Sequence, residues 1–342
     1  MKIIVDAMGG DHAPQEIVRG ALAAHERDGY EIVLVGREEE IRAAAGELPA
    51  GVSIRNATEV VEICDDPATA FKRKKDSSLT VGLNLLKEGE GDAFVSAGST
   101  GALLAAATLL VKRIRGVRRA AMAPLIPTAS GSMLLCDCGA NAECTVEYLV
   151  QFAYLAAIYA EKVLGRTRPR VALLNIGTEP SKGDTLRRET YAALTEAAQD
   201  GSINFVGNME PKEAMLGGAD VLVADGFSGN VMLKTVEGVA GFLGKRMKQM
   251  FLMNAKSKLA ALLVRSGLDG FKAQLDPNKV GGTAILGIVK PVIKAHGSSN
   301  AEAICNAIRQ AAENARADVA GEMAKYLPEK NGKNMESAID SE

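Results

Sequence analysis

The sequence predicts an α/β protein in which a mostly parallel β-sheet is covered by helices on both faces. Short apolar segments of strand length alternate with longer helix-like segments along most of the 342 residues, and such alternation is typical of parallel sheets. Several of the apolar segments end in small, polar loops that contain glycine. Ligands of open α/β sheets bind outside the carboxyl ends of the strands, so we expect the functional site at that edge.

The expected elements follow one another in chain order. In the first part, strands are predicted at residues 2–5, 31–35, 52–54 and 93–95, and helices at about 14–25, from 38 onward and after 101. Later strands are predicted at residues 121–123, 133–136, 171–174, 204–206 and 221–224, with a long buried helix at about 143–163. We expect residues 1–326 to form a single catalytic domain and residues 327–342 a polar tail.

Composition excludes several classes of protein. Hydrophobic residues make up 47% of the chain, which allows a large core and argues against disorder. A net charge of −2, an aromatic content of 4% and the absence of Trp give no basis for nucleic-acid binding. No segment reaches the roughly 18 uncharged apolar residues of a membrane-spanning helix. We therefore expect a globular protein that neither binds nucleic acid nor spans a membrane.

The cysteines indicate a reducing compartment. Their number, five, is odd, and the N-terminus MKIIVDAMGG has the character of a strand and loop without a signal peptide. These features predict a cytoplasmic protein. The spacing of Cys136, Cys138 and Cys144 fits no zinc motif, so we expect small buried side chains here. Nothing in the sequence demands a metal or another cofactor.

The most informative loop follows the strand predicted at residues 171–174 and reads NIGTEPSKGD. Glycine and proline let the backbone N–H groups of such a loop approach a ligand closely. Its lone lysine, Lys182, suits a phosphate or a polarised carbonyl. Comparable polar loops follow residues 5, 95, 136 and 224. One such loop is equally well explained as a tight turn, but five at the same edge of a parallel sheet predict an active site.

Two of these loops lead into predicted helices. Ser99, Thr100 and Gly101 open a helix, so their N–H groups and hydroxyls form an anion site supported by the helix dipole. The alternative is an ordinary N-cap. Asn230 likewise precedes a predicted helix and either caps it or faces the substrate.

Three aspartates, Asp6, Asp137 and Asp225, each come directly after a predicted strand. Such carboxylates brace neighbouring loop N–H groups, act as bases or hold a metal such as Mg²⁺. We favour loop bracing for at least two of them.

Familiar nucleotide and hydrolase motifs are absent. The sequence contains no G-x-x-x-x-G-K-[ST], no G-x-G-x-x-G after the first strand and no G-x-S-x-G. Only three histidines are available, which weakens a serine-hydrolase triad. An edge suited to phosphate but without a nucleotide signature favours phosphate itself or small phosphorylated substrates.

A basic amphipathic segment is expected at about residues 245–272. No acidic residue occurs between Glu237 and Asp269. Apolar side chains lie among the lysines and arginines at roughly helical spacing: Met250, Phe251, Leu259, Leu262 and Leu263. Such a helix binds an anionic membrane or an acidic partner. The alternative is a helix at a dimer interface, and the two are compatible.

Four segments closely resemble the bacterial phosphate acyltransferase (PlsX) family of phospholipid synthesis: IIVDAMGGDHAP, AGSTGALLA, LNIGTEPSKG and ADGFSGNVMLKTVEG. The similarity runs from residue 1 to about residue 325. It implies a three-layer α/β/α fold like that of isocitrate dehydrogenase, related to phosphotransacetylases. It also implies transfer of a fatty acyl group from acyl carrier protein to inorganic phosphate, with acyl phosphate as the product.

The resemblance further implies a homodimer, peripheral contact with an anionic membrane and a downstream glycerol-3-phosphate acyltransferase. It assigns catalysis to Lys182 and Asn230, which we expect to divide their roles between the phosphate and the developing oxyanion. No covalent acyl-enzyme is required, although Cys138 and Cys144 are alternative nucleophiles. The expected phosphate- and substrate-binding residues come from the same loops: Asp6, Gly9, Gly10, Ser99, Thr100, Gly101, Asn141, Asn175, Gly177, Glu179, Gly183, Asp225, Ser228 and Gly229.

Two other functions fit the sequence less well. A phosphotransacetylase-like enzyme acting on a short acyl-CoA shares the phosphate chemistry and differs in the thiol carrier. A non-catalytic membrane scaffold would use only the basic segment and would leave the polar strand ends unexplained.

Overall fold

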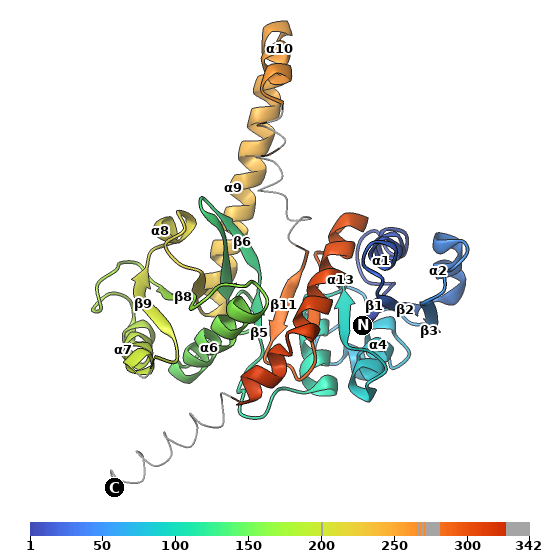
Figure 1. The fold of residues 1–342 in the computed structure, drawn as a ribbon, viewed down its shortest axis with the longest axis horizontal. Helices are drawn as coiled ribbons and strands as arrows, with labels where there is room; N and C mark the ends of the chain where they lie inside the picture. Colours follow the sequence, from blue (N-terminus) through green and yellow to red (C-terminus); the bar gives the residue numbers. More distant parts are fainter. Residues whose placement is uncertain (200, 266, 268–269, 271–280, 326–342) are drawn as a thin grey trace.

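The strands of the chain are divided between two sheets (Figure 1). The computed structural model describes residues 1–199, 201–265, 267, 270 and 281–325. The predicted tail at 327–342 and part of the predicted segment 245–272 lie outside the described residues. Within the described part, most strand pairs are parallel and helices pack beside them, so the predicted fold class is confirmed.

The first sheet has the order β3-β2-β1-β4-β12-β11-β5. Its strands are β1 (Lys2–Asp6), β2 (Glu31–Gly36), β3 (Val52–Asn56), β4 (Ala93–Ser96), β5 (Ala121–Ala123), β11 (Thr283–Leu286) and β12 (Val292–Lys294). Strand β11 runs antiparallel to both neighbours, and the other pairs are parallel. All four residues of β4 are buried because helices cover both faces of the sheet. This burial explains the continuous apolar run at residues 93–95 of the sequence.

The second sheet has the order β6-β7-β10-β8-β9. Its strands are β6 (Leu125–Thr128), β7 (Gly131–Cys136), β8 (Arg170–Leu174), β9 (Asn204–Met209) and β10 (Val221–Val223). Strand β6 is antiparallel to β7, and the remaining pairs are parallel. The carboxyl ends of β7, β10 and β8 therefore lie together at one edge of this sheet.

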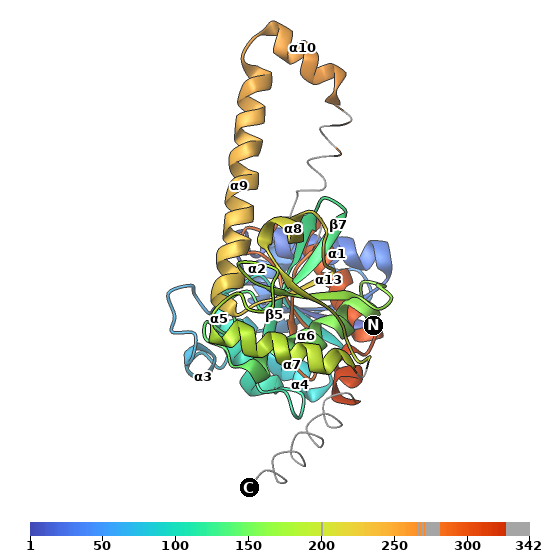
Figure 2. The ribbon, with the colours of Figure 1, turned by 90° about the vertical axis from the view of Figure 1, so that its left-hand side faces the viewer.

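Helices connect and cover the strands (Figures 1 and 2). They are α1 (Gln15–Asp28), α2 (Glu38–Ala45), α3 (Ala70–Arg73), α4 (Ser78–Glu88), α5 (Thr100–Ala106), α6 (Val146–Lys162), α7 (Thr185–Gln199), α8 (Pro211–Met215), α9 (Gly226–Leu252), α10 (Ala255–Leu263) and α13 (Ala301–Arg316). A π-helical stretch, Ala107–Val111, continues α5. One buried cluster includes Ile3 of the first sheet, Leu134 of the second and Ile304 of α13, so the two sheets share a hydrophobic core.

Helices α9 and α10 project away from both sheets (Figures 1 and 2). Helix α9 has 27 residues and is about 40 Å long at 1.5 Å per residue. The predicted basic segment is thus the outer part of a helix that begins near the sheet, followed by a second helix. The helix is interrupted between α9 and α10 because the backbone of Asn254 is extended. The Asn254 side chain accepts the Ser257 N–H at 2.9 Å and so caps α10.

The outer end of α9, the junction and the last turn of α10 expose apolar side chains. Met250 is 53% exposed, Met253 75%, Leu262 64% and Leu263 78%. Phe251 is half-buried and Leu259 is exposed. Among the described residues, no helix combines the length and apolar character needed to cross a bilayer.

Candidate active site

Three loops at the carboxyl edge of the second sheet are joined by hydrogen bonds. They follow β7, β8 and β10, and the loop after β10 leads directly into α9. The Gly226 N–H donates to the carbonyl of Asn141 at 2.7 Å, which connects the β7 loop to α9. Arg187 of α7 contacts Asp225 and Ser228, which connects the segment after β8 to the same helix.

Asp137 is the buried centre of the β7 loop. One carboxylate oxygen accepts the N–H groups of Cys138 at 2.7 Å, Ala140 at 3.3 Å and Met122 at 2.8 Å. The other accepts the backbone N–H of Asn141 at 2.7 Å and its amide group at 3.0 Å. Burial raises the pKa of Asp137, and these hydrogen bonds oppose the shift. Because Met122 lies in β5, this carboxylate also joins the two sheets.

The loop after β8 holds Lys182 with its ammonium accessible. The amide of Asn175 donates to the carbonyl of Lys182 at 3.2 Å. The Lys182 side chain is 48% exposed, and its Nζ lies 3.9 Å from a carboxylate oxygen of Glu179. A Cβ on Gly177 would lie 2.8 Å from Lys182 Cγ, so glycine leaves room for the lysine stem. Gly183 has φ +86°, a conformation that favours glycine.

Asn230 lies inside α9, so the expectation that it precedes a helix is wrong, and the alternative that it caps the helix is excluded. Asp225 is the N-cap residue, and its carboxylate accepts a backbone hydrogen bond of 2.9 Å from the first turn. A Cβ on Gly229 would lie 2.0 Å from the carbonyl oxygen of Asp137, so only glycine allows this approach. A Cβ on Gly139 would lie 3.7 Å from Asn230 Cγ. Asn230 is therefore held, exposed, beside the β7 loop.

A second cluster of polar loops lies at the carboxyl edge of the first sheet. Asp6 accepts the Ser96 hydroxyl at 2.6 Å and the Met8 N–H at 3.2 Å. A Cβ on Gly9 would lie 2.7 Å from the backbone nitrogen of Gly98, so the loops after β1 and β4 are in close contact. Gly10 has φ +114° and lies beside the same loop.

Ser99, Thr100 and Gly101 lie at the start of α5, as expected, but no side-chain hydrogen bond caps this helix. Ser99 is the N-cap residue. Thr100 is exposed, and Gly101 and Ser99 are partly exposed. Their hydroxyl and N–H groups can therefore be approached from solvent, as an anion site requires.

The predicted residues thus fall into two groups because the strands belong to two sheets. Asp6, Gly9, Gly10, Ser99, Thr100 and Gly101 lie at the edge of the first sheet. Asn141, Asn175, Gly177, Glu179, Lys182, Gly183, Asp225, Ser228, Gly229 and Asn230 lie at the edge of the second. Across the described part of the chain, no hydrogen bond or ion pair joins the two groups. The expectation that all five loops share the edge of one sheet is corrected accordingly.

Loop bracing is seen for all three aspartates that follow strands. Asp137 and Asp6 accept hydrogen bonds from their own loops, and Asp225 caps α9 and pairs with Arg187. Among the described residues, no group of three or more His, Cys, Asp or Glu side chains is arranged to hold a metal ion.

Sequence reasoning missed two cations at these edges. Lys294, at the end of β12, is 7% exposed and donates to the carbonyl of Ala97 at 3.3 Å. Burial lowers its pKa to about 8, and the nearby charges of Asp6 and Asp11 oppose this shift. Arg187 is the other. Neither Lys294 nor Arg187 belongs to a recognisable sequence motif. The one sequence feature that could have indicated a site residue is the position of Lys294 at the end of the apolar run VIK.

Two cysteines, Cys138 and Cys144, lie in the segment between β7 and α6. Burial raises the pKa of Cys138 to about 12 and that of Cys144 to about 11. Since the thiolate is the nucleophilic form, Cys138→Ser and Cys144→Ser should each leave kcat within about twofold of the unmodified protein. Steady-state kinetics of the two variants checks this, and loss of turnover in either folded variant would restore a covalent mechanism.

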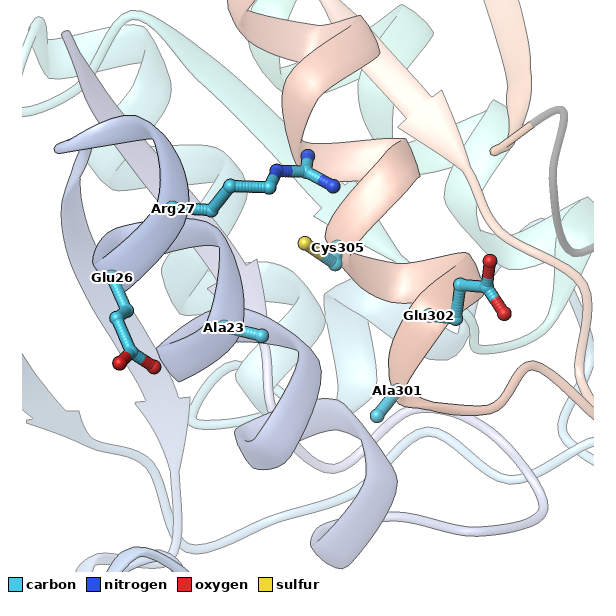
Figure 3. A pocket seen from close by; sticks show the side chains of 6 residues that line it. All are labelled: Ala23, Glu26, Arg27, Ala301, Glu302 and Cys305. Atoms are coloured by element: carbon cyan, nitrogen blue, oxygen red, sulfur yellow. The ribbon is translucent and has the colours of Figure 1, made fainter.

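A shallow cavity of ≈ 430 Å³ lies away from both groups, between α1 and α13 (Figure 3). Its lining is formed by Ala23, Glu26, Arg27, Ala301, Glu302 and Cys305. It contains none of the strand-end residues, so we assign it no part in the site.

The chain has the α/β fold of solved phosphotransacetylases. It superimposes on EutD phosphotransacetylase from Staphylococcus aureus with a TM-score of 0.63 at 18% identity, covering 92% of this chain and 94% of that one. A phosphotransacetylase from Streptococcus pyogenes gives 0.61 at 21% identity, covering 93% and 94%. These similarities establish the fold.

Sequence comparison establishes the family. Residues 1–322 match the family described as "Fatty acid synthesis protein", and the chain belongs to it. The phosphate acyltransferase of Desulfitobacterium hafniense is 48% identical over 331 residues, covering 96% of this chain and 98% of the relative. That of Geobacillus thermodenitrificans is 46% identical over 330 residues, covering 96% and 99%. The predicted resemblance is confirmed.

Proposed function

We propose that this protein is a phosphate acyltransferase, which moves a fatty acyl group from a thioester to inorganic phosphate for phospholipid synthesis. The relatives that share nearly its whole length have this name. The observation that carries the proposal for the site is the placement of Lys182 and Asn230. At one sheet edge, the loop after β8 presents an exposed ammonium and the start of α9 presents an exposed amide, without a nucleotide-binding motif beside them.

The reaction needs a positioned phosphate and a stabilised oxyanion. A phosphate oxygen attacks the thioester carbonyl carbon, the C–S bond breaks, and the sulfur leaves as a thiolate that takes up a proton. Lys182 and Asn230 divide two tasks: one holds the phosphate and the other donates to the carbonyl oxygen as it gains negative charge. One preorganised donor of this kind contributes about 2.7–4 kcal/mol. The thiols of Cys138 and Cys144, whose pKa values are raised by desolvation, are not needed.

Exposed apolar side chains beside these residues favour a long acyl chain. Ile176, in the Lys182 loop, is 80% exposed. Phe227 and Val231, in the first two turns of α9, are 67% and 52% exposed. A short acyl group would leave them in water, whereas a fatty acyl chain would cover them. We therefore favour acyl carrier protein as the donor, with the exposed basic residues of α9 and α10 available to this acidic partner.

Phosphate-dependent release of free thiol tests the function. The purified protein should release the thiol of long-chain acyl carrier protein only when phosphate is present, and acyl phosphate should appear in equal amount. Faster release from acetyl-CoA than from the carrier protein would favour the short-chain enzyme. No release from either donor would overturn the proposal and leave the scaffold function.

We further propose that the projecting helices make peripheral contact with an anionic membrane on the cytoplasmic side, and that the protein is a homodimer which passes acyl phosphate to a glycerol-3-phosphate acyltransferase. The support is the set of exposed apolar side chains along the outer part of α9 and along α10, which alternate with basic residues in the sequence. Basic residues attract anionic lipid and apolar ones enter the interface.

Leu262→Glu should weaken binding to vesicles that contain anionic phospholipid by at least about tenfold, because a charge replaces an apolar contact beside the headgroups. Vesicle flotation measures the change. Leu216→Glu is the matched control, since Leu216 is 63% exposed against 64% for Leu262 but lies at the end of α8, which packs against the base of α9, rather than in α10. Equal binding by both variants would remove α10 as the membrane contact.

A further inference from the structure

Arg187 is the one side chain in the described structure that links the segment carrying Lys182 to the helix carrying Asn230 by ion pairs. It lies in the first turn of α7, directly after the NIGTEPSKGD loop. One terminal nitrogen donates to Asp184 at 2.8 Å. The other donates to the carboxylate of Asp225 and, at 3.0 Å, to the hydroxyl of Ser228.

These contacts bridge two elements that have no covalent connection near the site. Asp184 is two residues after Lys182, and Asp225 is the N-cap of α9, one turn before Asn230. The Arg187 side chain is only 17% exposed and that of Asp225 only 7%. A planar guanidinium can hold two carboxylates at fixed angles, which a flexible lysine ammonium does not.

We propose that Arg187 is a positioning residue that sets the distance between Lys182 and Asn230. The inference rests on the proposed function, because it assigns the purpose of this bridge to the same reaction. A shift of about 1 Å in a catalytic group can lower turnover 10²-fold, and among the described residues Arg187 forms the only ion pairs that join the Lys182 segment to α9. The bridge therefore matters for the rate even though it touches no reacting atom.

The same contacts argue against Arg187 as a direct phosphate ligand. Its guanidinium already lies between two carboxylates, so the three charged groups together carry a net negative charge. Both hydrogens of one terminal nitrogen are used, on Asp225 and Ser228. An arriving phosphate would be repelled by this net negative charge, whereas the ammonium of Lys182 pairs, among the described residues, with Glu179 alone, at 3.9 Å.

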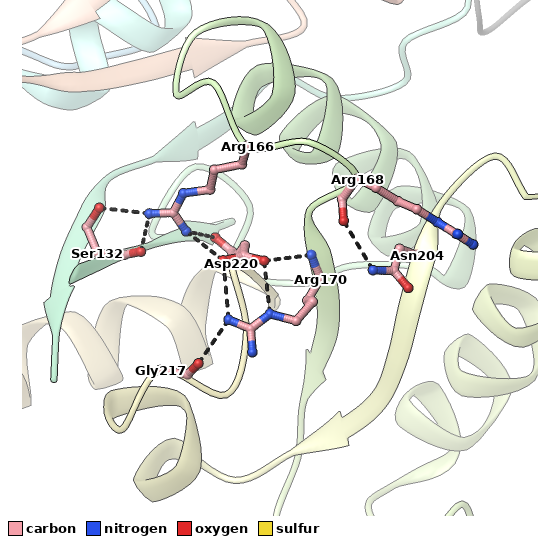
Figure 4. A network of polar contacts seen from close by, with 7 residues as sticks. All are labelled: Ser132, Arg166, Arg168, Arg170, Asn204, Gly217 and Asp220. Carbon is pink, nitrogen blue, oxygen red and sulfur yellow. Dashed lines mark hydrogen bonds and ion pairs between the residues drawn. The ribbon is translucent and has the colours of Figure 1, made fainter. Parts of the chain in front are cut away.

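The opposite edge of the same sheet contains a matched arginine network (Figure 4). Arg166, 22% exposed, pairs with Asp220 at 3.0 Å and donates to the hydroxyl of Ser132 at 3.0 Å. Asp220 directly precedes β10, and Ser132 is near the start of β7. Arg166→Ala therefore removes a comparable half-buried bridge at the amino ends of the strands, far from the carboxyl ends that carry the site.

A double-mutant cycle tests the proposal. Arg187→Ala should lower kcat by about 10- to 100-fold, whereas Arg166→Ala should leave kcat within about twofold. In a Lys182→Ala background the effect of Arg187→Ala should shrink to less than about threefold, because no Lys182–Asn230 distance remains to be kept. Full multiplication of the two effects would overturn the proposal and favour an independent role such as phosphate binding.

Hydrogen exchange supplies a readout that does not need activity. Residues 175–184 should exchange faster in Arg187→Ala than in the unmodified protein and should be unchanged in Arg166→Ala. Arg187→Lys, which keeps the charge and cannot hold both carboxylates, should give intermediate exchange and turnover and serves if the alanine variant does not fold. Unchanged exchange in both Arg187 variants would refute the bridge. Failure of the proposed function would show separately, as absence of phosphate-dependent turnover in the unmodified protein.

Discussion

Lys182→Ala is expected to lower kcat for phosphate-dependent thiol release by about 10²- to 10³-fold, the range for loss of one preorganised donor. The side chain is half-exposed, and among the described residues its ammonium forms one ion pair, a long one of 3.9 Å with Glu179. Its removal should therefore change the reaction far more than the free energy of unfolding. The two effects are measured by steady-state kinetics and by denaturant titration of the same preparation.

Lys212→Ala is the control for this variant. Lys212 is an exposed lysine in α8, the helix that follows β9 of the same sheet. Its loss should leave kcat unchanged. Near-normal turnover of a folded Lys182→Ala protein would remove the lysine from the reaction and would turn attention to the edge of the first sheet, where Lys294 lies buried.

Asp137→Ala should lower the free energy of unfolding by at least about 3 kcal/mol, because several buried N–H groups would lose a charged acceptor together. The Asp137 side chain is fully buried and accepts the N–H groups of Met122, Cys138 and Asn141 within 2.8 Å. Urea unfolding measures the loss. The variant should also lower kcat, since Asn230 is docked on the loop that this carboxylate braces.

Asp65→Ala is a suitable comparison. Asp65 forms a 2.6 Å ion pair with Lys74 at the surface, and its removal should change stability much less because water replaces the lost contact. If Asp137→Ala were as stable as Asp65→Ala, the carboxylate would not hold the β7 loop or join the two sheets.

The parallel strands were predictable because burial on both faces produces continuous apolar runs. Residues 2–5 and 171–174 were expected as strands and are found as β1 (Lys2–Asp6) and β8 (Arg170–Leu174). The antiparallel β11 and the short β12 were not expected. Their three or four residues each give no periodic signal, and without them the buried Lys294 could not be placed.

The amino-acid sequence by itself determined the chemistry of the strand-end loops: the lone lysine of NIGTEPSKGD, the glycines that let backbones meet, and the family similarity. Those properties are local, since they depend on residue types at neighbouring positions. Only the tertiary structure decided that the strands form two sheets, that Asp225 and not Asn230 caps α9, and that Arg187 bridges two loops. Such contacts join residues far apart in the chain, and their geometry is set by how the sheets and helices pack.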